Sequence, residues 1–126
     1  MSASKGKILL VDDEPTLLSL MRKILKEEGF TIDTAENGET ALKKVRTFRP
    51  DLVLLDIMMP GMSGVEVCQK MRDDPKTKDI KVVFLTVVPF TSAGVNVLRE
   101  FGALDYITKP TETKELLKRI RKALKA

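Results

Sequence analysis

The chain has 126 residues, of which 43% are hydrophobic and 32% charged, with a formal net charge of +4. These values fit one compact globular domain over residues 1–126 and exclude a disordered or low-complexity chain. One cysteine excludes an internal disulfide framework, and the short polar start predicts neither a signal nor a membrane segment, so we expect a cytoplasmic location. Basic residues are spread over helical faces beside acidic ones, so nucleic acid is not expected as a direct partner.

Strand-like runs alternate with segments of helical periodicity five times along the chain. The expected strands are residues 7–11, 31–35, 52–56, 82–85 and 105–107. Single apolar stripes predict helices around residues 17–25, 41–48, 67–71, 97–101 and 116–124. Alternating units with short connections predict an α/β fold with a parallel sheet, right-handed crossovers and helices on both faces.

Polar side chains collect where the predicted strands end. Asp12 and Asp13 follow the first strand, Asp56 ends the third, Thr86 follows the fourth and Lys109 follows the fifth. Because ligand sites of open α/β sheets lie at the carboxyl ends of the strands, we expect these side chains to form one site. A pair of carboxylates 4 Å apart repels by about 4 kcal/mol at an effective dielectric of 20, so such a cluster indicates a function.

The residue types at this edge favour phosphoryl chemistry with a metal ion. Oxygen ligands with room for water suit Mg²⁺, which usually binds one or two carboxylates and phosphate oxygens. A carboxylate can then act as the nucleophile and form an acyl phosphate. An ammonium group and a hydroxyl group would neutralise the oxygens of the transferring phosphoryl group.

Four segments together resemble the receiver domains of two-component response regulators, in particular those similar to chemotaxis regulators. The matching segments are residues 10–14, 56–64, 85–86 and 102–110, and the resemblance covers essentially the whole chain. It implies a flavodoxin-like (βα)5 three-layer sandwich whose five-stranded parallel sheet has the order 2-1-3-4-5. It also implies a signalling switch of a two-component system or phosphorelay rather than a turnover enzyme.

The resemblance assigns the metal ligands and the phosphoryl acceptor. Asp56 would accept the phosphoryl group from a histidine kinase or a histidine phosphotransfer protein. Asp13 and Asp56 would bind Mg²⁺ directly together with the backbone carbonyl of Met58, and Asp12 would act through water.

The remaining roles concern the response to phosphorylation. Lys109 would pair with the phosphoryl group or with Asp56, Thr86 would hydrogen-bond to the phosphoryl group, and Tyr106 would swing inward as the switch. The Lys109–Pro110 peptide bond is expected to be cis. A downstream effector protein would bind the face formed by the fourth helix, the last strand and the last helix, where we expect Val95 and Phe90 to be exposed. The protein would be a monomer or a phosphorylation-dependent dimer.

Three positions depart from the family pattern. Val87 stands where a small residue is usual, which predicts a tighter space beside the phosphoryl group. The segment from Thr86 to Gly102 is about one residue longer than expected, so the fourth helix is expected to begin late or to be partly irregular. Thr111 replaces the usual aromatic residue.

Two other classes of protein remain as alternatives. An aspartate-nucleophile phosphohydrolase has an opening motif that residues 12–16 faintly resemble. Such an enzyme needs a second acid two residues after the nucleophile, for which Glu14 is a poor stand-in and Met58 cannot serve, and no cap segment is present. A receiver-like binding module that is never phosphorylated typically lacks one of the acids or the lysine. Cys68 is interpreted as a core residue, because it lies on an apolar stripe and the chain contains no histidine.

Overall fold

The strands form one parallel sheet in the order β2-β1-β3-β4-β5, as the resemblance implies. The computed structural model describes residues 4–126, apart from the side chains of Ala93, Gly94 and Val97. The strands are β1 (Lys7–Val11), β2 (Thr31–Ala35), β3 (Leu52–Leu55), β4 (Lys81–Thr86) and β5 (Asp105–Thr108). β3 ends one residue earlier than predicted, so Asp56 begins the following loop, although its amide still donates to the carbonyl of Val11.

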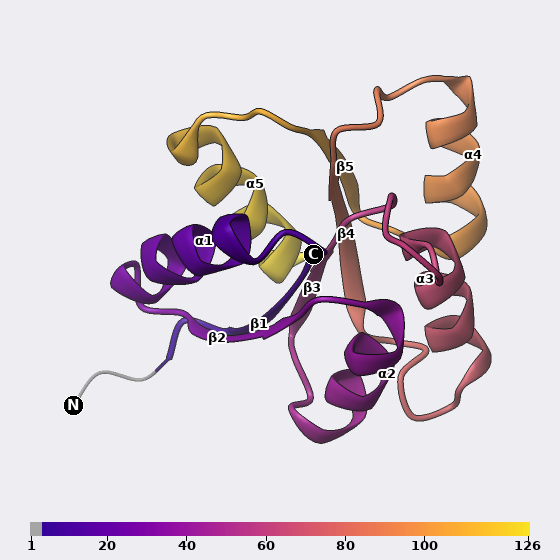
Figure 1. Ribbon diagram of the computed structural model, residues 1–126, viewed down its shortest axis with the longest axis horizontal. Helices are drawn as coiled ribbons and strands as arrows, with labels where there is room; N and C mark the ends of the chain where they lie inside the picture. Colours follow the sequence, from indigo (N-terminus) through magenta and orange to yellow (C-terminus); the bar gives the residue numbers. More distant parts are fainter. Residues whose placement is uncertain (1–3) are drawn as a thin grey trace.

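Helices cover both faces of the sheet and complete a three-layer sandwich. They are α1 (Pro15–Glu27), α2 (Gly38–Thr47), α3 (Gly64–Asp73), α4 (Ser92–Phe101) and α5 (Thr113–Lys125). α1 and α5 lie on one face, and α2, α3 and α4 lie on the other (Figure 1). α4 begins at Ser92, after the loop of residues 87–91. Within residues 4–126, no helix has the length and apolar character needed to span a bilayer.

Local capping chemistry fixes several helix ends near the loops. The side chains of Asn37 and Ser63 accept hydrogen bonds from backbone amides at the starts of α2 and α3, at 2.8 and 3.2 Å. Gly102 ends α4 in the left-handed conformation, with a φ of 66°, where a glycine carries little strain. These caps allow the short connections that bring the strand ends together.

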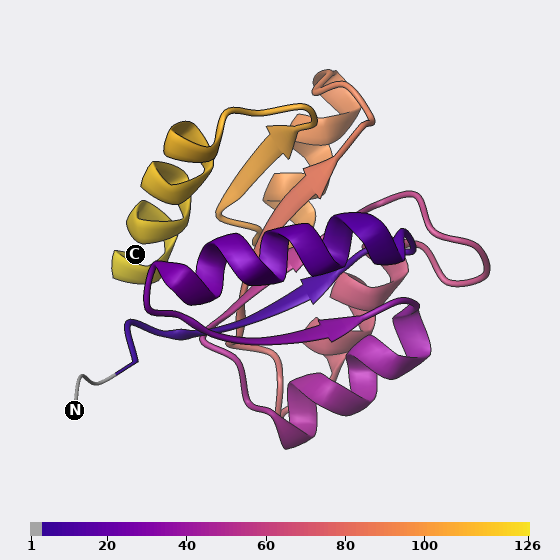
Figure 2. The same ribbon diagram turned by 60° about the vertical axis from the view of Figure 1, so that its left-hand side comes forward.

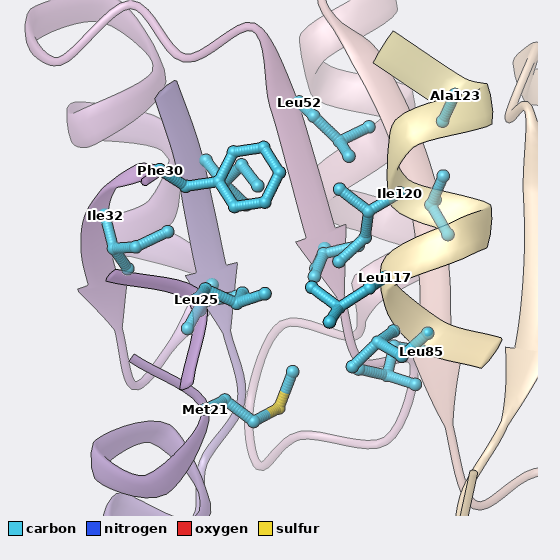
Figure 3. Packing of buried hydrophobic residues seen from close by; sticks show 14 of the residues in the cluster. Met21, Leu25, Phe30, Ile32, Leu52, Leu85, Leu117, Ile120 and Ala123 are labelled. Carbon is cyan, nitrogen blue, oxygen red and sulfur yellow. The ribbon is translucent and has the colours of Figure 1, made fainter. Parts of the chain in front are cut away.

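Buried apolar side chains fill the space on each side of the sheet. Figure 3 shows the cluster between the sheet, α1 and α5, where Met21 and Leu25 lie opposite Leu117 and Ile120. The other cluster joins the sheet to α2, α3 and α4 and includes Cys68, which is buried as predicted. Each fully buried side chain of leucine size contributes about 1.5–3 kcal/mol, so the two clusters supply most of the stabilisation that positions the strand ends.

Arg72, in the last turn of α3, ties three backbone segments together. Its guanidinium donates to the carbonyl of Phe101 at 2.7 Å and to the carbonyls of Lys78 and Ile80 at 2.8 Å each. Phe101 is the last residue of α4, so Arg72 fixes the carboxyl end of this helix to α3 and to the segment that leads into β4.

Candidate functional site

The register of the central strands places two acids side by side. Val11 at the end of β1 pairs with Leu55 at the end of β3, so Asp12 and Asp56 are the next residues on neighbouring strands. The strand arrows in Figure 2 point toward the same edge of the molecule, where these residues lie. The sheet topology therefore delivers the acids that the sequence predicts to this edge.

Three carboxylates form a cluster at the carboxyl edge. Oxygen atoms of Asp12, Asp13 and Asp56 all lie within 4.8 Å of one another. Asp12 and Asp56 are only 6% and 5% exposed, whereas Asp13 is exposed. Backbone amides hold the two buried side chains, because Glu14 donates to Asp12 Oδ1 at 3.0 Å and Met58 donates to Asp56 Oδ1 at 3.3 Å.

This donor set fits a hard divalent cation. All three candidate side chains offer oxygen, and one of them lies at the surface, where the ligand sphere can be completed by water and by phosphate oxygens. Mg²⁺ has these preferences, whereas zinc favours the nitrogen and sulfur ligands that this cluster lacks.

Lys109 lies between the two buried acids. Its Nζ is 2.5 Å from Asp12 Oδ2 and 3.7 Å from Asp56 Oδ2. The family resemblance implies Asp56 or the phosphoryl group as its partner, and the structure adds Asp12 as the nearer partner. Two neighbouring buried carboxylates require a cation, and an ammonium group between them compensates both. The Lys109–Pro110 peptide bond is cis, as expected.

Thr86 lies at the end of β4, beside the acids, and is fully buried. Its carbonyl accepts from the amide of Lys109 at 2.7 Å, which joins the ends of β4 and β5. Its hydroxyl accepts from the amide of Val88 at 3.3 Å, so the first residues of the loop after β4 fold back toward it.

Tyr106 already points inward in this structure, although the sequence analysis expected it to swing inward only on phosphorylation. Its side chain is 6% exposed, and its hydroxyl donates to the carbonyl of Val88 at 2.8 Å. The ring packs near Phe84 and Phe90, whose ring centroids are 6.1 and 4.9 Å away. Burial, and to a smaller extent the charge of Asp56, raises the pKa of the Tyr106 phenol above its ordinary value.

Gly64 supports the site in a way that the sequence analysis did not identify. A Cβ atom at this position would lie 2.0 Å from the carbonyl oxygen of Asp56, and the Gly64 amide donates to the carbonyl of Ile57 at 2.9 Å. The start of α3 therefore packs directly against the backbone of Asp56. The signal in the sequence was the glycine directly after the helix-capping Ser63, but the close approach depends on tertiary structure.

Two departures from the family pattern, Val87 and Thr111, line a hollow between α1 and the connection from β5 to α5. Val87 is 59% exposed and lines this hollow together with Lys109, Thr111 and Leu20 of α1. Met58, whose carbonyl was predicted to bind the metal, has a side chain that is 62% exposed. Exposed apolar side chains therefore stand in the loops that follow β4 and Asp56.

Val95 and Phe90, the two apolar side chains predicted to be exposed at the face of α4, β5 and α5, are exposed. Val95 is 37% and Phe90 47% exposed, whereas the side chain of Val97, predicted to be buried, lies outside the described residues. Arg119 of α5 donates two hydrogen bonds to the carboxylate of Asp105 and one to the carbonyl of Tyr106. Partial burial alone would raise the pKa of Asp105, but hydrogen bonds from Arg119 and the Tyr106 amide outweigh it and hold the pKa below its usual range.

Comparison with known proteins gives one consistent family. The family described as response regulator receiver domain matches residues 8–121. The chain is 42% identical to the DNA-binding response regulator MtrA of Mycolicibacterium smegmatis over 125 residues, which are 99% of this chain and 53% of MtrA. The chain thus spans about half the length of the curated relatives that it matches first.

Solved structures show the same fold. The response regulator protein TrrA of Thermotoga maritima, solved in complex with Mg²⁺–BeF, is 44% identical with a TM-score of 0.79, over 93% of this chain and 97% of that one. The chemotaxis protein CheY4 of Vibrio cholerae is 27% identical with a TM-score of 0.88, over 96% of this chain and 99% of that one.

Proposed function

The chain belongs to the family of response regulator receiver domains, and on that premise we propose that Asp56 accepts a phosphoryl group in two-component signalling. The observation that carries this proposal is the convergence of three carboxylates and one ammonium group at a single sheet edge. The donor would be the phosphohistidine of a histidine kinase or of a histidine phosphotransfer protein. The apolar clusters on both faces of one sheet support a single domain over residues 1–126.

Each group at the edge has a defined task in this transfer. An Asp56 carboxylate oxygen attacks phosphorus, a P–O bond forms, and the P–N bond of the phosphohistidine breaks. Oδ2 of Asp56 is the oxygen nearest to Lys109, so the ammonium is placed to neutralise charge on the transferring group. The Thr86 hydroxyl can donate its hydrogen to the same group, because it acts only as an acceptor toward the amide of Val88.

The acid cluster would hold Mg²⁺ during the transfer. Asp13, Asp56 and the backbone carbonyl of Met58 would be direct ligands, and Asp12 would act through water. The bound ion would supply charge neutralisation for the phosphoryl oxygens. The Mg²⁺–BeF complex of the similar Thermotoga protein supports this assignment.

The partner surface proposed here is the face of α4, β5 and α5. α5 carries six basic residues and one acidic residue, and Asp105 of β5 is already paired with Arg119. The excess positive charge therefore favours a downstream effector protein with an acidic surface, and the receiver itself has no need to contact nucleic acid. A cytoplasmic location follows from the proposal, because the kinase draws its phosphoryl group from cytoplasmic ATP.

The structure gives little support to the two alternative functions. A phosphohydrolase needs an acid two residues after its nucleophile. Met58 occupies that position after Asp56, and the other candidate nucleophile, Asp12, is paired with Lys109. A binding module that is never phosphorylated would have no use for the buried acid pair and its ammonium partner. We therefore propose that the acyl phosphate is the signal itself, without catalytic turnover of a substrate.

Intact mass after incubation with Mg²⁺ and a small phosphodonor tests the function. Wild-type protein is expected to gain one phosphoryl group at Asp56, and Asp56→Asn is expected to gain none while remaining folded. Asp79→Asn is the matched control, because Asp79 is an exposed acid at the opposite edge of the sheet. Uptake by Asp56→Asn at the wild-type rate would refute the assignment, and steady donor consumption without an adduct would indicate a phosphohydrolase.

A further inference from the structure

Two aromatic rings neighbour the ring of Tyr106. Phe84 of β4 is its cross-strand neighbour in the sheet, with ring centroids 6.1 Å apart. Phe90 approaches from the loop between β4 and α4, which lies at the upper right of Figure 1, and its ring is tilted by 58° at a centroid distance of 4.9 Å. A tilted pair at this distance has the favourable geometry for two aromatic rings. Phe84 belongs to the rigid sheet, so Phe90 is the neighbour that can move with the loop.

Val88 connects this aromatic group to the phosphoryl site. Its amide donates to the hydroxyl of Thr86 and its carbonyl accepts from the hydroxyl of Tyr106, at 3.3 and 2.8 Å. A single peptide segment is thus held between the residue beside Asp56 and the inward tyrosine. The position of Tyr106 and the position of the loop are therefore coupled by direct contacts.

Phe90 is exposed to an unusual degree for a phenylalanine. It is 47% exposed, so one side of the ring contacts solvent while the other contacts Tyr106. Pro89 precedes it, and the proline ring fixes its own φ angle and stiffens the loop at this point. Release of Phe90 into solvent would separate the two rings and remove the cover over Tyr106.

We propose that Phe90 is a positioning residue that holds Tyr106 inward before any phosphoryl group is bound. It acts through Tyr106 and the loop rather than by touching the phosphoryl group. The receiver then rests near the geometry in which Thr86 and the loop are drawn toward Asp56. This inference rests on the proposed function, because it concerns the readiness of the same site.

The contact between Phe90 and Tyr106 is expected to shift the equilibrium between the inward and outward conformations of the Tyr106 side chain. The energy of one aromatic pair corresponds to a change of about threefold to tenfold in that ratio. A ligand that binds only the inward state loses apparent affinity in proportion to the inward fraction. Removal of the Phe90 ring is therefore expected to weaken binding of a phosphoryl mimic, by a factor of up to about threefold to tenfold.

Tyr106 provides its own probe, because the chain contains one tyrosine and no tryptophan. Acrylamide quenching of tyrosine fluorescence is expected to increase in Phe90→Ala and to return to the wild-type level when Mg²⁺ and beryllofluoride saturate the site. Beryllofluoride affinity is measured in the same samples. Leu104→Ala is the matched control, because Leu104 is another exposed large apolar residue and lies directly before β5, at the end of the strand away from the acid cluster.

A double-mutant cycle shows whether Phe90 acts through the tyrosine. Phe90→Ala is expected to have no effect on beryllofluoride affinity when Tyr106→Ala is already present. An affinity loss that persists in that background, or wild-type quenching and affinity in Phe90→Ala alone, would overturn the inference. Wild-type protein that binds no beryllofluoride would instead refute the proposed function, and the quenching comparison would still report on the ring contact.

Discussion

Backbone hydrogen bonds orient the two buried acids at the site. One oxygen of Asp12 and one of Asp56 accept from amides two residues further along the chain, which leaves the second oxygen of each directed at Lys109. Such short-range bonds are typical of aspartate in turns. The reactive oxygens are thus set by loop geometry, which makes the packing of the loop after β3 important for reactivity.

Gly64→Ala tests this dependence on the loop. The added methyl group would overlap the carbonyl of Asp56, at 2.0 Å, so the backbone of either α3 or the loop must shift. We expect the free energy of unfolding to fall by about 2–3 kcal/mol and phosphoryl uptake to slow. Urea unfolding and the rate of mass gain with a small phosphodonor measure the two effects.

Gly61→Ala serves as the comparison, because a Cβ at Gly61 meets nothing within 4 Å although its φ is 77°. Backbone strain alone costs about 1 kcal/mol there. Equal losses in the free energy of unfolding of the two variants would show that the close contact between Gly64 and Asp56 does not limit which residues are tolerated at position 64.

Among the structural elements, β5 and α5 are joined by a charged pair at the partner face. Arg119 binds both oxygens of Asp105 and the carbonyl of Tyr106, so one guanidinium connects the helix to the strand that carries the switch residue. Both side chains are less than a third exposed. A bidentate pair of this kind is more specific in geometry than an ordinary surface ion pair.

This pair predicts a pH dependence of stability. The folded-state pKa of Asp105 lies below the unfolded value of about 3.9, so its stabilising contribution is complete above that value. The contribution is lost as the pH falls through the folded-state pKa. We expect Asp105→Asn to be less stable than wild type by about 1 kcal/mol at neutral pH, and the difference to shrink below about pH 4. Chemical unfolding at several pH values checks this, and a constant difference would contradict it.

The sequence predicts elements well where burial alone decides them. The inner strands β1, β3 and β4 are predicted by apolar runs, because a strand covered on both faces has no polar break. The edge strands β2 and β5 contain polar residues and are predicted by the regular alternation of strands and helices. The inward position of Tyr106 and the nearness of Lys109 to Asp12 were not predicted, because each depends on which side chains meet across separate strands. The same applies to Gly64, whose neighbour is a backbone atom eight positions earlier.

For the whole molecule, the acid cluster opposes folding while it enables metal binding. Three carboxylates lie within 4.8 Å of one another, and one ammonium group compensates the buried two. The exposed Asp13 has no such partner among the described residues. Its charge therefore adds repulsion that a bound cation would remove.

Asp13→Asn is expected to melt at a higher temperature than wild type in a chelating buffer, because one repulsive charge is lost. In Mg²⁺ the order should reverse, because the variant loses a ligand and binds the ion at least about tenfold more weakly. Thermal melts with and without Mg²⁺ measure both effects. A variant that melts lower than wild type in the chelating buffer would show that repulsion at Asp13 is negligible.

Arg72 anchors the carboxyl end of α4, because it binds the carbonyl of Phe101 together with those of Lys78 and Ile80 before β4. The other end of α4 begins after Thr91, whose side chain makes no capping hydrogen bond, and is joined to the loop that carries Phe90. Because α4 is anchored at Phe101, a displacement of its first residue tilts the helix. α4 has ten residues and is about 15 Å long, so a displacement of about 1 Å at Ser92 corresponds to a tilt of roughly 4°. Small loop movements beside Asp56 are thereby converted into an angular change across the surface where a partner would bind.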